Sequence, residues 1–362
     1  MSIIARMALL SPSPLARKAA TNISSRPRRF LSLQSPAKPD ALLRRSYLYV
    51  PSSSEKMLQK SLDNKSDVII YDLEDSVPPS EKDKSGARER LGPFINATSE
   101  ERLPRPERLA VRLNGINTPF FKRDIAQALR LPSIRTLLLP KIHSPRDLHH
   151  VSREIYSASH LSPESLPKRS QPLDIIASIE SARGLWSVGE IASWKSEYGD
   201  VEGGKLSALL FAAEDYCADT SIIRTPSRLE LLYARSRIVI AAKAFGLEAI
   251  DMVCVNYKDL DYLKEECEDG RRLGFNGKQA IHPTQVDIIQ STYVPTAKEI
   301  LRAAKILHQM SLAHASQKGA FGLDLDGAND GGKEMIDAPM VLQAENTIRA
   351  AKAAGLEIPV LG

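Results

Sequence analysis

The sequence has little of what stabilises small secreted proteins or membrane proteins. Its three cysteines, Cys217, Cys254 and Cys267, form no C-x-x-C pair, which argues against a disulfide framework and against structural zinc. No uncharged apolar run approaches the ~18 residues of a membrane span. Aromatic residues make up only 6% of the chain, whereas 43% is hydrophobic and 26% charged. We therefore expect an ordinary globular protein of a reducing compartment, without a membrane partner.

Acidic residues are absent from positions 1–39, which carry seven basic ones. The whole chain has a formal charge of +5, but residues 40–362 carry 42 basic and 44 acidic side chains and sum to −2. An acid-free leader rich in Ser, Arg and Ala is typical of a mitochondrial transit peptide. A disordered tail without a targeting role is the alternative. We predict a transit peptide over 1–39 and location in the mitochondrial matrix.

The placement of the charge also bears on nucleic acid binding. A sequence pI near 9.0 would favour it, but the basic excess lies in the leader. The rest of the chain lacks a stripe of interleaved basic and aromatic residues on which bases could stack. A nucleic-acid-binding or scaffold protein therefore stays the less favoured alternative, and we expect no nucleic acid partner.

Short apolar runs alternate with longer segments of helical pattern. The runs are apolar throughout, as strands buried on both faces of a parallel sheet are. Eight such units over about 250 residues predict a (β/α)8 TIM barrel, with a doubly wound open sheet as the alternative. The predicted strands cover 46–50, 68–72, 109–113, 136–140, 174–179, 208–212, 249–254 and 279–281, and helical segments include 80–95, 119–131, 144–157 and 227–245.

Two stretches interrupt this rhythm. The Ser- and Pro-rich segment 157–172 predicts a surface loop, and the Gly- and Asp-rich segment 319–332 predicts a mobile connection. A helical pattern resumes over 333–355. We therefore predict a catalytic barrel over 40–300 and a C-terminal helical extension carrying a lid over 301–362.

Acidic residues gather where three predicted strands end. Asp72, Glu74 and Asp75 follow one strand, Glu180 follows another, and Glu214 and Asp215 follow a third. The carboxyl ends of barrel strands meet at one rim, where the repulsion between carboxylates favours a bound cation. Oxygen ligands without nearby His or Cys favour Mg²⁺ over zinc. The alternative, less favoured for three such runs, is that these acids cap the following helices.

Basic residues also stand at strand ends. Arg112 and Lys141 each close a predicted strand. The Arg112 guanidinium could hold a substrate carboxylate by two hydrogen bonds, or it could form a structural ion pair with neighbouring acids, and position alone does not decide between them. Lys56 and Lys60 lie one helical turn apart, where they could meet phosphates or form a solvated face.

Seven motifs follow one another along the chain: RSYLYVPS from Arg45, YDLEDSV from Tyr71, VRLN from Val111, LPK from Leu139, IESARG from Ile179, AEDYCAD from Ala213 and GKQAIHP from Gly277. In this order they resemble the citrate lyase beta-subunit-like branch of the HpcH/HpaI aldolase family. The resemblance covers roughly residues 44–350. The late run from Met335 to Met340 also resembles the C-terminal segment of the citramalyl-CoA lyase branch.

The resemblance implies roles for individual residues. Glu180 and Asp215 match two Mg²⁺ ligands, Glu74 and Asp75 match acids that support the waters of the metal, and Arg112 matches the residue that holds the keto-acid portion. Asp337 matches a catalytic acid/base that relatives deliver on a C-terminal lid from a neighbouring subunit of a trimer. Residues that match CoA contacts are Tyr49, Lys56, Lys60, Ile281 and His282, although His282 before Pro283 is more typical of a pocket wall or structural histidine than of a general base.

The resemblance also implies an activity. We expect a Mg²⁺-dependent lyase, a homotrimer that cleaves a 3-hydroxyacyl-CoA such as (3S)-citramalyl-CoA reversibly into acetyl-CoA and pyruvate. Cleavage of malyl-CoA or methylmalyl-CoA, or a malate-synthase-like hydrolysis of the thioester, stays open on the same scaffold. One methyl group is worth only ~1–3 kcal/mol of discrimination, and no residue of the sequence visibly decides among these substrates.

Overall fold

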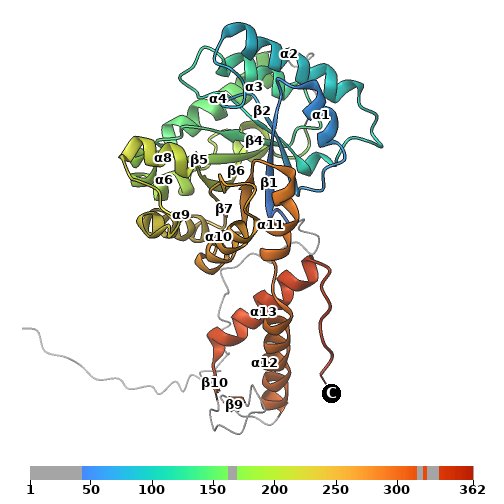
Figure 1. The fold of residues 1–362 in the computed structure, drawn as a ribbon, viewed down its shortest axis with the longest axis vertical. Helices are drawn as coiled ribbons and strands as arrows, with labels where there is room; N and C mark the ends of the chain where they lie inside the picture. The colour runs from blue at the N-terminus through green and yellow to red at the C-terminus, as the bar shows by residue number, and fades with distance from the viewer. Residues whose placement is uncertain (1–42, 162–168, 316–320, 324–333, 362) are drawn as a thin grey trace, which may run out of the picture. The chain divides into compact units, whose positions relative to one another are not determined.

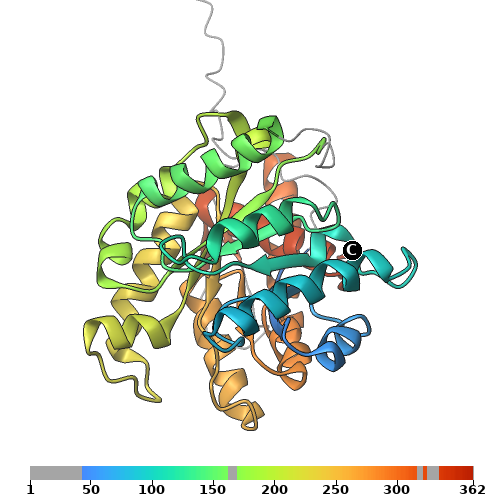
Figure 2. The same ribbon diagram turned by 90° about the horizontal axis from the view of Figure 1, so that it is seen from above.

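Eight parallel strands form a closed barrel at the centre of the chain (Figure 1, Figure 2). The computed structural model describes residues 43–161, 169–315, 321–323 and 334–361, so the predicted leader over 1–39 lies outside the described residues. Each strand pairs in parallel with the next along the chain, and β1 pairs with β8. The predicted (β/α)8 barrel is confirmed, and the open sheet is wrong.

The elements follow the predicted alternation. The barrel strands are β1 (Ser46–Pro51), β2 (Val68–Asp72), β3 (Leu109–Arg112), β4 (Thr136–Leu139), β5 (Asp174–Ile179), β6 (Lys205–Phe211), β7 (Glu248–Asp251) and β8 (Gly277–Ala280). The helices are α1 (Glu55–Ser61), α2 (Glu81–Ala97), α3 (Phe121–Leu129), α4 (Pro145–Leu161), α5 (Ala182–Trp186), α6 (Val188–Ser193), α7 (Gly199–Gly203), α8 (Ala213–Thr220), α9 (Leu232–Ala244), α10 (Leu260–Leu273), α11 (Val286–Thr292), α12 (Ala297–Ala315) and α13 (Ala338–Ala353). Three short 3₁₀ turns lie at Pro106–Arg108, Leu229–Leu231 and Pro283–Gln285.

Alternation along each strand separates two apolar layers. In β2, Val68 and Ile70 belong to a small buried cluster with one or two residues from each of several other strands, whereas Ile69 and Tyr71 belong to the large cluster shared with the helices. Successive side chains of a strand point to opposite faces, so the small cluster fills the barrel and the large one lies outside it. Both faces are buried, which explains the continuous apolar runs.

Buried charges join α10 to β7 and β8. The Lys278 ammonium on β8 lies 3.0 Å from Glu266 of α10 and 4.0 Å from Asp251 of β7, and all three side chains are fully buried. Arg235 of α9 donates to both Asp251 oxygens, at 2.7 and 3.1 Å. Because a buried charge is costly without a partner, these pairs set the positions of α9 and α10 against the strands.

Several predicted helices and strands begin or end at other residues than predicted. Helix α4 continues to Leu161, into the segment predicted as a loop, of which residues 162–168 lie outside the described part. The helix predicted over 227–245 begins with the 3₁₀ turn Leu229–Leu231, after Arg228 with a left-handed φ of 59°. Strand β6 begins at Lys205, earlier than predicted. These ends depend on pairing and turn geometry, which apolar patterns do not record.

The C-terminal extension is a helical hairpin with a small apolar cluster of its own. The cluster consists of Ala303 and Ile306 of α12, Ala344 of α13, and Ile336, which lies just before α13. The helix predicted from residue 333 instead begins at residue 338, because 334–336 form strand β10 (Glu334–Ile336), antiparallel to β9 (Phe321–Leu323). The rest of the predicted connection lies almost wholly outside the described residues. The boundary predicted at residue 300 falls within α12 and stays a prediction.

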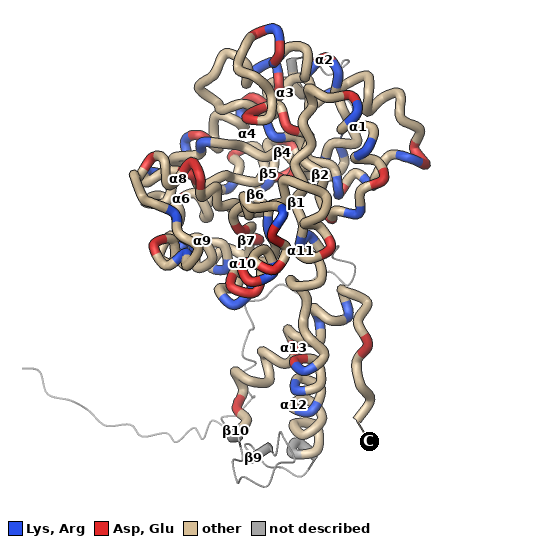
Figure 3. The backbone as a smooth tube through the Cα atoms, in the orientation of Figure 1, with Lys and Arg blue, Asp and Glu red and all other residues tan. Residues whose placement is uncertain are grey.

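Charged residues of both signs are interspersed on the helices around the barrel. Helix α10, for example, contains both acidic and basic residues, as the colours of Figure 3 show. Among the described helices, none combines the length and the apolar character that crossing a bilayer requires.

Candidate active site

A cavity of about 410 Å³ opens where the barrel strands end. Most of the predicted site residues lie together in it, because they stand on the strand faces that point into the barrel. Asp72 shares the face of Val68 and Ile70 on β2, and Arg112 shares the face of Ala110 on β3. The lining includes Tyr49, Asp72, Asp75, Arg112, Leu138, Ser178, Glu180, Ala212, Glu214, Asp215, Val253, Gln279 and Ile281. A larger cavity of about 500 Å³ lies along α1 and α2 and contains none of the predicted metal ligands.

Glu180 and Asp215 are two acids of this cavity whose pKa is raised by burial. Glu180 is 6% exposed, and burial with the nearby Asp215 charge raises its pKa to about 7. Burial and the charge of Asp75 raise the pKa of Asp215. Two carboxylates whose charged forms are destabilised by desolvation and by one another form a site that a cation would stabilise.

Neighbouring groups orient the Glu180 carboxylate. Its Oε1 accepts the backbone N–H of Lys141 at 2.8 Å, and its Oε2 accepts the Ser178 hydroxyl at 2.7 Å. Lys141 has a left-handed φ of 57°, a conformation that is unfavourable for a residue other than glycine and is often found at functional sites. The strained turn after β4 thus delivers an N–H to the predicted metal ligand.

The donor set fits Mg²⁺ better than it fits zinc. No cluster of three or more His, Cys, Asp or Glu side chains that could hold a metal ion occurs within the described ranges. Mg²⁺ commonly takes one or two protein carboxylates and completes its shell with water or substrate oxygens. The Glu180 and Asp215 pair is compatible with that mode, and the three cysteines are buried and free, without a role in this cavity.

Arg112 makes the ion pairs that sequence position left open. Its Nε and Nη2 donate to Asp72 at 2.7 and 2.6 Å, and its Nη1 donates to Asp75 at 3.0 Å. Nη1 also lies 3.1 Å from Glu74. The Tyr49 ring centre lies 4.7 Å from the guanidinium carbon, so the arginine is held by acids and by an aromatic face.

Asp72 is named in the sequence analysis only as one of the acids at a strand end, but in the structure it is the main partner of Arg112. It is fully buried and accepts the Nε–H and Nη2–H of Arg112 and the backbone N–H groups of Glu74 and Ser76. Burial would raise the pKa of Asp72, but Arg112 and these hydrogen bonds lower it below its usual value. The alternation of β2 points to this inward position, which is the signal that could have identified it.

The two acids predicted to support the metal take different environments. Glu74 is 6% exposed, and burial raises its pKa although Lys141 Nζ lies 2.7 Å from its carboxylate. The side chain of Asp75 is 58% exposed and pairs with Arg112. The charge of Glu74 contributes to the raised pKa of Glu180, and the charge of Asp75 contributes to the raised pKa of Asp215.

The predicted CoA contacts divide into two groups. Tyr49 and Ile281 line the cavity, and the Tyr49 hydroxyl donates to Gln279 at 2.9 Å. Lys56 and Lys60 are exposed on α1 and do not line it. His282 stacks on Tyr257 with ring centres 4.9 Å apart and caps the turn Pro283–Gln285, which is a structural arrangement rather than that of a general base.

Asp337 is not among the residues that line the cavity. It is exposed, and its Oδ1 accepts the Met340 backbone N–H at 3.1 Å, which makes it the N-cap of α13. The contacts of the described chain therefore give Asp337 a local structural role and do not by themselves bring it to the acids of the barrel.

Comparisons with known proteins place these residues in a family context. Residues 45–283 match the family HpcH/HpaI aldolase/citrate lyase. The mitochondrial citramalyl-CoA lyase of Rattus norvegicus is 32% identical over 313 residues, which cover 85% of this chain and 86% of that protein. The citrate lyase subunit beta of Leuconostoc mesenteroides subsp. cremoris is also 32% identical, over 86% of this chain and 94% of its own.

One similar protein has a solved structure that contains bound ligands. The protein CitE from Mycobacterium tuberculosis, in complex with magnesium, acetoacetate and coenzyme A, is 27% identical to this chain with a TM-score of 0.62. The match covers 86% of this chain and 98% of that one.

Proposed function

The chain belongs to the HpcH/HpaI aldolase/citrate lyase family, and from this premise we propose that it is a Mg²⁺-dependent carbon–carbon lyase acting on CoA thioesters. The preferred substrate in this proposal is (3S)-citramalyl-CoA, cleaved reversibly to acetyl-CoA and pyruvate. The observation that supports it most is the placement of Glu180, Asp215 and Arg112 in one cavity at the strand ends. The name of the rat relative and the ligands of the mycobacterial structure favour the same chemistry.

In this mechanism the barrel residues bind and orient the substrate. Glu180 and Asp215 would hold the Mg²⁺ ion, which would supply positive charge to polarise the substrate oxygens. The hydrogen bonds of Arg112 to Asp72 and Asp75 use three of its five N–H groups, so the guanidinium still has a donor for the substrate carboxylate. Arg112 thereby orients the keto-acid portion.

Cleavage then requires the movement of two protons. Transfer of the β-hydroxyl proton to solvent water allows the C–C bond to break, and the electron pair of that bond passes to the thioester half as an enolate. Asp337 donates a proton to the enolate carbon and yields acetyl-CoA; in condensation it removes the same proton. Positive charge and hydrogen-bond donors near the enolate oxygen stabilise it where its charge develops.

One assay tests the activity. The Mg²⁺-loaded full-length protein is incubated with citramalyl-CoA, malyl-CoA or methylmalyl-CoA, and the keto acid, acetyl-CoA or propionyl-CoA, and free CoA are measured separately. We expect citramalyl-CoA to have the highest kcat/KM. Faster cleavage of malyl-CoA or methylmalyl-CoA would reassign the substrate, and free CoA would indicate a malate-synthase-like hydrolysis. No turnover of any thioester would refute the proposal.

The proposal includes a trimer in which Asp337 serves a neighbouring active site. It is supported by the resemblance of the Asp337 motif, and Asp337 does not line the cavity of its own chain. Sedimentation equilibrium tests the subunit number. Mixing subunits inactivated at Glu180 with subunits inactivated at Asp337 tests the sharing, because activity should reappear only if sites are shared.

The proposal also includes the mitochondrial matrix as location. It is supported by the acid-free leader and by mitochondrial relatives of rat and human. Import into isolated mitochondria followed by N-terminal sequencing should find the chain shortened near residue 39, and an unprocessed chain outside the organelle would contradict it.

A further inference from the structure

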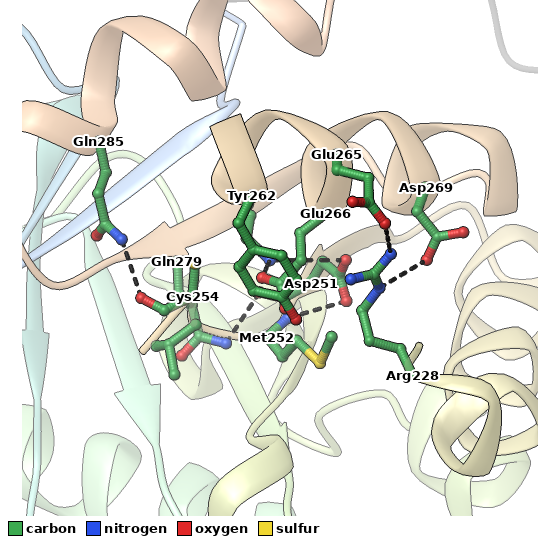
Figure 4. Close-up of polar contacts among 12 residues, drawn as sticks. Arg228, Asp251, Met252, Cys254, Tyr262, Glu265, Glu266, Asp269, Gln279 and Gln285 are labelled. Atoms are coloured by element: carbon green, nitrogen blue, oxygen red, sulfur yellow. Dashed lines mark hydrogen bonds and ion pairs between the residues drawn. The ribbon is translucent and has the colours of Figure 1, made fainter. Parts of the chain in front are cut away.

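Two buried glutamines belong to β8 and the turn that follows it; Gln279 lines the cavity, Gln285 does not, and neither is among the predicted site residues. Gln279 on β8 is 3% exposed, and Gln285 in the turn after β8 is fully buried (Figure 4). Each uses its amide oxygen and nitrogen in hydrogen bonds. They bind different groups, however: Gln279 binds the Tyr49 hydroxyl, and Gln285 binds the backbone of Ile281 and His282.

Gln279 joins three strands through its amide. Its Nε2 donates to the Phe211 carbonyl at 2.9 Å and to the Asp251 carbonyl at 3.0 Å, which close β6 and β7. Its Oε1 accepts the hydroxyl of Tyr49 on β1. A buried amide with both sides satisfied has one favourable orientation, so the Tyr49 phenol is held in place.

The Tyr49 ring carries this restraint to Arg112. The ring lies against the guanidinium, which the fully buried Asp72 holds from another side by two hydrogen bonds. The guanidinium is thus oriented by a carboxylate and by an aromatic face that Gln279 fixes. Any displacement of the phenol would move the donors that Arg112 presents to the cavity.

Gln285 also uses both sides of its amide, but it binds the backbone of the segment after β8 and of Cys254. Its Oε1 accepts the backbone N–H groups of Ile281 at 2.8 Å and His282 at 3.2 Å, and its Nε2 donates to the Cys254 carbonyl at 2.9 Å. In the described part of the chain its amide makes no hydrogen bond to Tyr49 or Arg112, and it does not line the cavity. Gln285 therefore shapes the segment that carries the pocket residue Ile281.

We propose that Gln279 and Gln285 are positioning residues for opposite halves of the substrate. Gln279 orients Arg112, and with it the keto-acid portion, whereas Gln285 orients the 281–282 backbone, and with it the acyl-CoA portion. This inference rests on the function proposed above. It predicts that one glutamine variant raises the KM for the keto acid and the other raises the KM for the acyl-CoA. A loss of stability does not produce this pattern, because unfolding lowers the active fraction and Vmax without changing either KM.

The test compares Gln279→Met and Gln285→Met in the condensation of acetyl-CoA with pyruvate. Methionine keeps the length of the side chain and removes its hydrogen bonds. We expect Gln279→Met to raise the KM for pyruvate by roughly tenfold and that for acetyl-CoA by less than about twofold, and Gln285→Met to do the reverse. Calorimetric titration of CoA and of pyruvate into the Mg²⁺-loaded variants should show the same cross-over without turnover.

Tyr49→Phe provides a milder variant, because it removes one hydroxyl and leaves both carbonyls bonded to Gln279. We expect a rise of about two- to threefold in the KM for pyruvate and none in that for acetyl-CoA. Parallel changes of both KM values in both glutamine variants, or a Tyr49→Phe effect on acetyl-CoA alone, would overturn the inference. A wild-type protein without condensation activity would refute the proposed function, and the calorimetric cross-over would still decide the roles of the glutamines.

Discussion

The barrel mouth and the C-terminal hairpin are built in opposite ways. At the mouth, two candidate side chains of the metal and keto-acid site are held by other groups: Glu180 by Lys141 and Ser178, and Arg112 by Asp72. In the hairpin, Asp337 is exposed and makes one local capping bond. The hairpin also has an apolar cluster separate from that of the barrel.

This difference indicates a division of labour in the proposed reaction. A site for a metal ion and a charged substrate must be organised before binding, because reorganisation during the reaction is costly. A group that only moves a proton can arrive later, when closure excludes water and raises its pKa. The predictions below test whether the barrel and the hairpin separate binding from proton transfer in this way.

Removal of the metal should have the largest effect. EDTA should abolish activity of the wild type, and Mg²⁺ should restore it. Glu180→Gln should lower Mg²⁺ affinity by more than the roughly 10–100-fold that loss of an outer partner costs. Calorimetry measures the affinity. Glu214→Gln is the matched control on the same rim, and activity that is indifferent to chelation would remove the barrel from the proposed chemistry.

Loss of the Asp337 acid should have the next largest effect. Asp337→Asn should lower kcat by about 10²–10⁴-fold, the usual contribution of a general acid or base. Affinities for Mg²⁺ and CoA, measured by calorimetry, should not change. Undiminished turnover would exclude the assigned role.

A second substitution separates catalysis from the helix cap. Asn is as good an N-cap as Asp, whereas Asp337→Ala also removes the cap, at a cost of about 1 kcal/mol. Both variants should lose the same activity, and hydrogen exchange in α13 should increase only in the alanine variant.

Breaking the buried ion pair between Arg112 and Asp72 should lower the stability of the protein. Asp72→Ala leaves a largely buried guanidinium without its main partner and should lower the free energy of unfolding by about 3–5 kcal/mol. Urea denaturation measures it. Asp75→Ala, which removes an exposed partner of the same arginine, should cost no more than about 1 kcal/mol. Equal losses would show that the Asp72 contact is not special.

The smallest expected effect is a pH dependence of metal binding. In the metal-free protein, burial raises the pKa of Glu180 to about 7, so at pH 6 most of this carboxyl is protonated and at pH 8 most is charged. Since a ligand must be deprotonated, Mg²⁺ should bind roughly tenfold more weakly at pH 6. The Mg²⁺-induced rise in Tm should therefore be larger at pH 8, and Glu180→Gln should remove the difference.

The sequence was most informative where local pattern decides structure. The apolar runs identified all eight barrel strands. The acids after them predicted that Glu180 and Asp215 meet at one rim, and both line the cavity there, because a parallel barrel brings all its strand ends together. The ends of elements were less accurate. Pairing with β9 is what makes 334–336 a strand rather than the start of a helix.

Other features depend on residues that are distant in the sequence. Asp72 and Arg112 lie 40 positions apart, and Tyr49 and Gln279 lie 230 apart, yet each pair is in direct contact. A sequence read alone treats Arg112 as either a substrate clamp or an ion-pair partner, and only the barrel shows the partners that hold it. Gln279 carries no signal of its own, since a glutamine in a strand is unremarkable until its neighbours are known.

The sequence by itself thus determined the barrel class and the acids at its rim, because alternation and strand order are properties of the chain. The opening absence of acids from 1–39 likewise separated a basic leader from a nearly neutral body. The tertiary structure alone decided which charges neutralise one another, which amides hold them, and that Asp337 caps a helix outside the cavity lining. Closing the barrel creates these contacts, because it brings β1 beside β8 and fixes which side chains face one another inside it.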